Sequence, residues 1–170
     1  LWAVAVITEI VMFAFSNRFY RAFGAVNLIV IGVGCGVVRW LMIGLEPPLA
    51  VLFVAQALHA GSFGLTHLGT MHFIRENVPD NMRNTAQGMY SAVSGGILLS
   101  ATMWASGPLY GVLGGHAYFV MAFYSLLAFG VVAGDVVNPD EADEVADLAE
   151  VDANPADLVD RYRPLGTGRR

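Results

Sequence analysis

The sequence predicts an all-α integral membrane protein, and three observations support this. Of its 170 residues 56% are hydrophobic and only 14% are charged, with no lysine, whereas soluble domains are about 25% charged. Long apolar stretches recur at about the 20 residues that a helix needs to cross a bilayer core about 30 Å thick. Ten of the fourteen acidic residues follow residue 134. The net charge of -5 therefore comes from the C-terminal end of the chain, and it gives no indication of a nucleic-acid partner.

Five segments are predicted to cross the membrane within a transmembrane domain of residues 1–137. The approximate spans are 1–16, 25–45, 49–74, 86–110 and 116–137. The connections NRFYRAFG, EPP, RENVPDNMRN and GPLYGVLGGHAY contain the Pro, Gly, Asn and Asp residues that indicate turns. The first span is short and lacks a Met, a basic region or a cleavage site before it, so it does not begin a signal peptide. We expect a fragment whose N-terminal part is missing.

The arginines predict the orientation of these spans. Eight of the nine lie outside the spans, and they follow the first, third and fifth: Arg18, Arg21, Arg75, Arg83, Arg161, Arg163, Arg169 and Arg170. Basic residues are enriched on the cytoplasmic side of membrane proteins. The pattern predicts a multi-pass protein of the inner cell membrane, with Leu1 on the outside and the C-terminal tail in the cytoplasm.

Residues 138–170 are predicted to form an acidic, mostly disordered cytoplasmic tail. The segment is polar, poor in aromatic residues and interrupted by prolines, so it buries too little apolar surface to order itself. A short helix is expected from Pro139 to Val151, with acidic residues in its first turn.

Small residues at four-residue spacing predict closely packed helices. Gly32 and Gly36 form one such pair, and Gly107 and Gly111 form another. Such spacing lets the backbones of membrane helices approach each other.

Ionisable side chains inside the spans are the first candidates for a functional site. They are Glu9, Arg39, His59 and His67. A charged group at the centre of a membrane helix costs about 2.5–3.5 kcal/mol on insertion scales, so it faces the bundle interior or a water-filled cavity. On the third span a polar stripe covers an arc of about 100° and contains Gln56, His59, Phe63, Thr66, His67 and Thr70. His72 lies opposite the stripe and near Arg75, and it is excluded.

The rise of a helix places these groups at two depths. Counted from the cytoplasmic ends at about 1.5 Å per residue, Arg39 and His59 lie about 20 Å up, and Glu9 and His67 lie about 10 Å up. The count predicts an outer pair of basic groups suited to an anion, and an inner Glu9 and His67 able to exchange a proton. Phe63, with Trp40, Tyr90 and Trp104, offers aromatic surface.

Structural interpretations of the same residues remain open. Glu9 and Arg39 could pair only with each other or with a missing half, and each histidine could be a neutral imidazole bonded to a neighbouring helix. A metal-dependent membrane enzyme is disfavoured, because His59 and His67 are about 12 Å apart along the axis and no HExxH pair is present. We therefore expect no catalytic residue, metal or other cofactor. A non-transporting membrane receptor or scaffold is a further interpretation that stays open.

Four blocks of the sequence resemble one family of transporters. They are LWAVAVITEIVMFAFSNRFYR, VVRWLMIG, AQALHAGSFGLTHLGTMHFI and AQGMYSAVSGG, in that order. The chain resembles the phenylpropionate permease-like family of the major facilitator superfamily. The resemblance implies a twelve-helix fold in two six-helix halves, of which this chain supplies helices 8 to 12.

For function, the resemblance implies a secondary active transporter. It would take up a small carboxylate, aromatic or not, with protons, by alternating access around a mid-bilayer site. The partners implied are a small-molecule substrate, protons, the lipid bilayer and the missing N-terminal half. The more distant sugar symporters of the lactose permease type carry an acid, an Arg and a His at the places of Glu9, Arg39, and His59 or His67. Ser62 and Thr70 stand where those symporters have a second acid, so their proton mechanism does not transfer whole.

Overall fold

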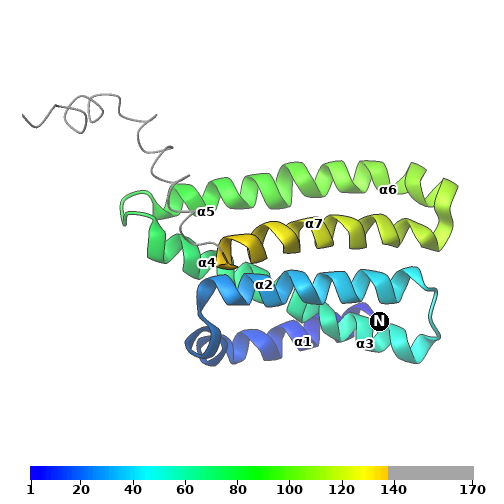
Figure 1. The fold of residues 1–170 in the computed structure, drawn as a ribbon, viewed down its shortest axis with the longest axis horizontal. Coiled ribbons are helices and arrows are strands. Elements are labelled where there is room, and N and C mark those ends of the chain that lie inside the picture. The colour runs from blue at the N-terminus through cyan, green and yellow to red at the C-terminus, as the bar shows by residue number, and fades with distance from the viewer. Residues whose placement is uncertain (138–170) are drawn as a thin grey trace, which may run out of the picture. The chain divides into compact units, whose positions relative to one another are not determined.

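The computed structural model describes residues 1–137, and all regular structure in this range is helical (Figure 1). The elements are α1 (Trp2–Ala14), α2 (Ser16–Gly44), α3 (Leu49–His59), the π-helix η1 (Ala60–Leu65), α4 (Thr66–Asn77), α5 (Arg83–Ser91), the π-helix η2 (Ala92–Leu98), α6 (Leu99–Leu113), the 3-10 turn η3 (Gly114–His116) and α7 (Ala117–Val137). The expected all-α class is confirmed for these residues. The predicted tail and its short helix lie outside the described residues.

Three continuous helical stretches are long and apolar enough to cross a membrane. They cover residues 16–44, 49–77 and 83–134. The last is divided by the turn at Gly114, whose φ of 56° reverses the chain between α6 and α7. α1 is apolar but has only 13 residues.

The chain reverses direction between α1 and α2 within the predicted connection NRFYRAFG, but most of that connection is helical. α2 begins at Ser16, and its helical backbone is broken at Gly24, with φ 75° and ψ 173°. Phe19 and Tyr20 pack against the buried residues Met12, Leu28, Ala60 and Leu65. Packing of these two aromatic rings favours a helical course for residues 16–23 before the break at Gly24. The glycine-rich connection is likewise shorter than predicted, because α6 continues past Pro108 to Leu113.

α2 packs closely and antiparallel against α3, η1 and α4. A methyl group at Gly69 would lie 2.7 Å from the carbonyl oxygen of Ala25, and one at Gly61 would lie 2.8 Å from the sulfur of Cys35. Glycine at these two positions therefore allows a backbone separation that a side chain would prevent.

Gly36 lies where three helical segments meet. A methyl group there would lie 3.5 Å from Ser125 of α7 and 3.6 Å from Ser62 of η1. A methyl group at Gly44 would lie 3.2 Å from Phe119, near the other end of α7. α7 therefore runs antiparallel to α2, and it lies between α2 and the α5–α6 helix (Figure 1).

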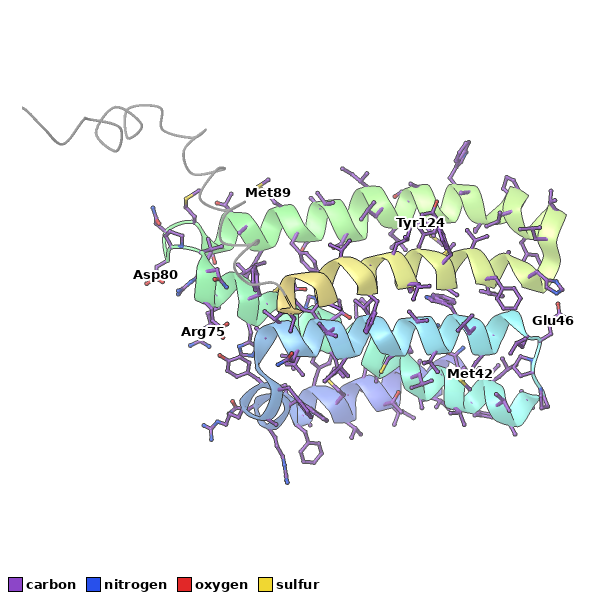
Figure 2. All side chains as sticks on the ribbon, viewed as in Figure 1. Met42, Glu46, Arg75, Asp80, Met89 and Tyr124 are labelled. Carbon is purple, nitrogen blue, oxygen red and sulfur yellow. The ribbon has the colours of Figure 1, made fainter. Side chains whose placement is uncertain are left out.

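α1 runs parallel to the α3–α4 helix. The Met12 side chain occupies the space beside Gly64, and the Phe13 ring lies edge-on to His67 with centroids 6.5 Å apart. Together with the antiparallel pairs, this gives the alternating directions expected of successive membrane spans. Glu46 marks one end of the bundle and Asp80 the other (Figure 2).

Candidate functional site

An acid–imidazole pair links α1 to α3. Nε2 of His59 lies 3.0 Å from Oε1 of Glu9, and the two side chains are 30% and 19% exposed. The contact is within ion-pair distance for a protonated His59 but lacks an aligned hydrogen bond. Both Oε1 of Glu9 and Nδ1 of His59 are buried without a hydrogen-bond partner in the described range. The pair is thus close enough to share a proton and retains unused hydrogen-bonding capacity.

This pairing corrects the two depths expected from the sequence, because Glu9 meets His59 and not His67. The depths were counted in residues from the cytoplasmic end of each span, which assumed that all these ends lie at the same depth in the membrane. α1 instead ends at Ala14, near the level of His67, while α4 continues to Asn77. Glu9 therefore lies beside a residue nearer the start of the α3–α4 helix.

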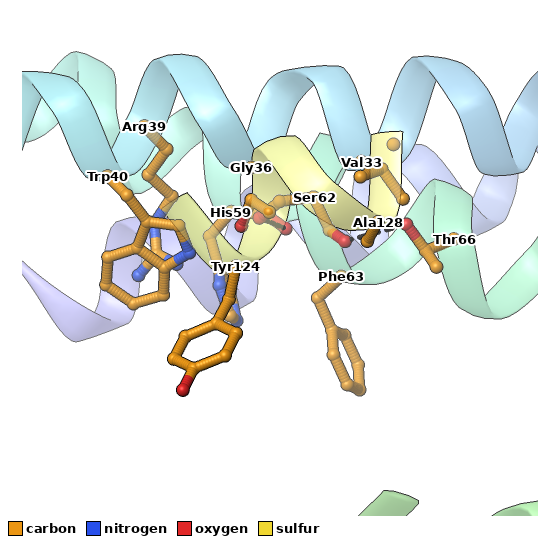
Figure 3. A pocket seen from close by; sticks show the side chains of 12 residues that line it. Val33, Gly36, Arg39, Trp40, His59, Ser62, Phe63, Thr66, Tyr124 and Ala128 are labelled. Atoms are coloured by element: carbon orange, nitrogen blue, oxygen red, sulfur yellow. Dashed lines mark hydrogen bonds between the residues drawn. The ribbon is translucent and has the colours of Figure 1, made fainter. Parts of the chain in front are cut away.

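His59 also faces a cavity of about 410 Å³ between α2, η1 and α7, which we call the central cavity (Figure 3). Its lining is Gly32, Val33, Gly36, Arg39, Trp40, His59, Ser62, Phe63, Thr66, Tyr124, Ser125 and Ala128. The volume is within the range of about 300–1,000 Å³ typical of small-molecule sites. The lining combines one cation, one imidazole, several hydroxyls and three large aromatic rings.

Among residues 1–137, Arg39 is the only cation that lines the central cavity. Its guanidinium carbon lies 4.3 Å from the centre of the Trp40 ring, a cation–π contact. Its Nε is buried without a hydrogen-bond partner among residues 1–137. Because guanidinium donors match the two oxygens of a carboxylate, Arg39 is equipped to bind an anion that enters from this cavity.

Aromatic rings provide the apolar part of the same cavity. In Figure 3, Trp40, Phe63 and Tyr124 project to the same side of the ribbon. Phe63 is 52% and Tyr124 is 63% exposed. Since buried aromatic residues each remove about 150–250 Å² from solvent, such exposure leaves surface available to a flat apolar ligand.

The π-helix η1 begins directly after His59 and ends before Thr66. Across it the rings of His59, Phe63 and His67 form one column, with centroid separations of 5.6 and 6.0 Å and interplanar angles of 9° and 4°. π-helical turns are rare and frequently occur at functional sites. Phe63 separates the two imidazoles, so His67 does not share the Glu9 contact.

The remaining sequence candidates lie at the edges of this arrangement. His67 contacts Phe13, Phe63 and Tyr90 of α5, and it does not line the central cavity. Gln56 lines a neighbouring cavity that also contains Arg39 and Trp40. The structure therefore brings Glu9, Arg39, His59 and Phe63 together and leaves Gln56 and His67 on either side.

Two lining residues from the last span were missed by the sequence reasoning. Tyr124 and Ser125 of α7 face the central cavity. They form an adjacent polar pair in a span that is otherwise almost entirely apolar, and that contrast is the signal that could have identified them.

His72, which was excluded, stacks on Tyr20 with ring centroids 3.7 Å apart. In the described part of the chain, no three His, Cys, Asp or Glu residues come close enough together to hold a metal ion.

Comparison with known proteins gives one family and several relatives. The model of the MFS_1 like family matches residues 1–121. A probable 3-phenylpropionic acid transporter of Escherichia coli (strain K12) is 38% identical over 129 residues, which cover 75% of this chain and 34% of the relative.

Two relatives of lower identity are named as a transporter and a permease. An uncharacterized transporter of Bacillus subtilis (strain 168) is 24% identical over 77% of this chain and 33% of its own length. A maltose permease of Geobacillus stearothermophilus is 28% identical over 48% of this chain and 21% of its own length. The chain thus spans about a third or less of the curated relatives it matches. No solved structure matches.

Proposed function

Because the chain belongs to the MFS_1 like family of the major facilitator superfamily, whose members are transporters and not enzymes, we propose that it forms part of a secondary active transporter. The proposed substrate is a small carboxylate with an apolar, aromatic part, taken up with protons. The observation that carries the proposal is the central cavity, where Arg39 and exposed aromatic rings lie beside the Glu9–His59 pair.

Binding begins with the carboxylate at Arg39. In a site shielded from water, a charge-assisted and bidentate contact is stronger than in solution. Phe63 and Tyr124 then cover the apolar part of the substrate, and the hydroxyls of Ser62 and Thr66 are close enough to the same space to orient it. The relative of Escherichia coli named for 3-phenylpropionic acid supports an aromatic acid as the first probe.

Coupling to protons follows from the charges that share the cavity. A carboxylate bound at Arg39 brings a negative charge near His59, which favours a proton on the Glu9–His59 pair. By linkage, a proton on that pair favours the bound carboxylate in return. Mutual reinforcement of this kind is what a symporter requires.

We place the assembly in the inner membrane, with Leu1 outside and the chain leaving its last span on the cytoplasmic side, on the strength of the arginine pattern. A further half of the transporter would supply the opposite wall of the site. Alternating access would then be rocking of the two halves around the central cavity.

The test is uptake of radiolabelled 3-phenylpropionate by cells that express the full reading frame, meaning the whole coding sequence in which residues 1–170 lie. We expect accumulation that a protonophore abolishes, and loss of the proton dependence in His59→Gln with normal membrane insertion. A panel of aliphatic and aromatic carboxylates defines the substrate class. Insertion without accumulation of any of these acids would contradict transport and favour the receptor or scaffold alternative.

A further inference from the structure

A second cavity of about 670 Å³ lies beside the central cavity, beneath the connection between α2 and α3. We call it the loop-side cavity. It lies at the end of the bundle marked by Glu46 (Figure 2). Its polar wall is formed by Arg39 and Gln56, and its aromatic wall by Trp40, Tyr110 and Tyr118. Its size also fits a small-molecule site.

The two cavities share only Arg39 and Trp40 among their lining residues. These two side chains contact each other, so together they form the boundary between the cavities. A guanidinium at the boundary can serve an anion on either side without moving far. The unpartnered Nε of Arg39 leaves it with donor capacity for such an anion.

The α3 helix supplies one polar residue to each cavity. Gln56 lines the loop-side cavity and His59 lines the central cavity. They are three residues apart, about 5 Å along the helix axis. An anion that leaves Gln56 and moves to the side of Arg39 nearer His59 therefore travels about one helical turn along α3.

The three rings in the aromatic wall of the loop-side cavity contact one another. Tyr118 stacks on Trp40 with centroids 5.8 Å apart, and Tyr110 lies edge-on to Tyr118 at 6.5 Å. Tyr110 is nonetheless 56% exposed, comparable to the 52% of Phe63 in the central cavity. The loop-side cavity therefore also offers aromatic surface to the apolar part of a carboxylate.

Within the described part of the chain, Glu46 is the one acid in the lining of this cavity. Its φ of 50° is unusual for a residue with a side chain. The side chain lies over Gly115, where any Cβ would overlap it. The carboxylate opposes an entering anion by like-charge repulsion, so it limits the affinity of the cavity.

We propose that the loop-side cavity is a second, transient binding station for the transported carboxylate, held by Gln56 and Arg39 before it passes Trp40 into the central cavity. The inference rests on the proposed function. It assigns Gln56 a role in substrate entry, and it assigns Glu46 the role of keeping that station weak.

Uptake kinetics of the full reading frame give the first test. Gln56→Leu removes one hydrogen bond to the anion and raises KM about fivefold at unchanged kcat. Glu46→Gln removes the repulsion and lowers KM. Gln87→Leu, which removes the same amide from a cavity of α4 and α5, leaves both constants unchanged and serves as the matched control. An unchanged KM in both Gln56→Leu and Glu46→Gln overturns the proposal.

Substrate protection gives the second test. In a single-cysteine background with Cys35→Ser, Leu52→Cys reports the loop-side cavity through its labelling by a maleimide. We expect 3-phenylpropionate to slow this labelling even when Ser62→Trp fills the central cavity. Protection that disappears with Ser62→Trp shows that only the central cavity binds, and it overturns the second station. Absence of both uptake and protection in the parent protein instead contradicts the proposed function.

Discussion

The interface of α2 with α3, η1 and α4 differs sharply from the surface of the α5–α6 helix, although both are rich in small residues. Methyl groups at Gly32, Gly61 and Gly69 would meet neighbouring atoms at 3.0 Å or less, whereas those at Gly96 and Gly107 would meet nothing within 4 Å. No residue of α5, η2 or α6 is buried in the described structure.

The comparison shows that the same spacing of small residues occurs both at a helix interface that is already formed and on a surface that is still exposed. In the first region the glycines are already used for contact between helices. In the second they leave a smooth, uncovered surface, and small residues gain little from lipid compared with another helix. If the proposed function holds, we expect a further segment of the proposed transporter to cover α5 and α6.

The largest expected effect comes from filling the used interface. In residues 1–170 expressed as a fluorescent fusion, Gly69→Val drives Cβ against the backbone of Ala25 and Ile29. Overpacking on fixed backbone atoms costs about 3 kcal/mol, so the folded fraction in fluorescence-detected gel filtration should fall steeply. Gly96→Val is the matched control and should retain the parent profile. Equal profiles would break the comparison.

A smaller loss of stability is expected from a substitution on the surface of α5 and α6 when a further segment covers that surface. In the full reading frame, Gly96→Val should lower the apparent melting temperature, consistent with an overpacking cost of about 1–2 kcal/mol. The same substitution in residues 1–170 alone should not. If the melting temperature responds equally in both contexts, lipid and not protein covers this surface.

The smallest effect separates two threonines with the same local bond. The hydroxyls of Thr66 and Thr102 each donate to the carbonyl four residues earlier, at 2.9 and 2.8 Å. Only Thr66 also lies against Gly32 across the α2 interface. Thr66→Val should destabilise the fold by about 0.6 kcal/mol, the typical value for polar contacts between membrane helices. Thr102→Val should leave the melting temperature unchanged, and a shift as large as that of Thr66→Val would count against a special role for this interface.

Hydropathy and polar periodicity predicted much of the fold and part of the candidate site. The long apolar helices and the column of His59, Phe63 and His67 follow from composition and from residue spacing within one helix. These properties depend on local sequence, which explains why they could be predicted.

The remainder depends on contacts between helices. The partner of Glu9 is decided by where α1 ends relative to α4, and Tyr124 enters the site through the rotation of α7 against α2. The helical course of residues 16–23 depends on Phe19 and Tyr20 packing against the core. None of these is encoded in a local pattern.

The central claim is that Arg39 binds the transported carboxylate, and one measurement tests it most directly. Proteoliposomes that contain the full reading frame are given an imposed pH gradient and radiolabelled 3-phenylpropionate. Arg18→Ala, which removes an exposed guanidinium near the α1–α2 junction, is the matched control. We predict that Arg18→Ala accumulates substrate like the parent and that Arg39→Ala does not, since a lost charge-assisted contact costs about 1.5–3 kcal/mol. Accumulation by Arg39→Ala at the parent rate would contradict the account.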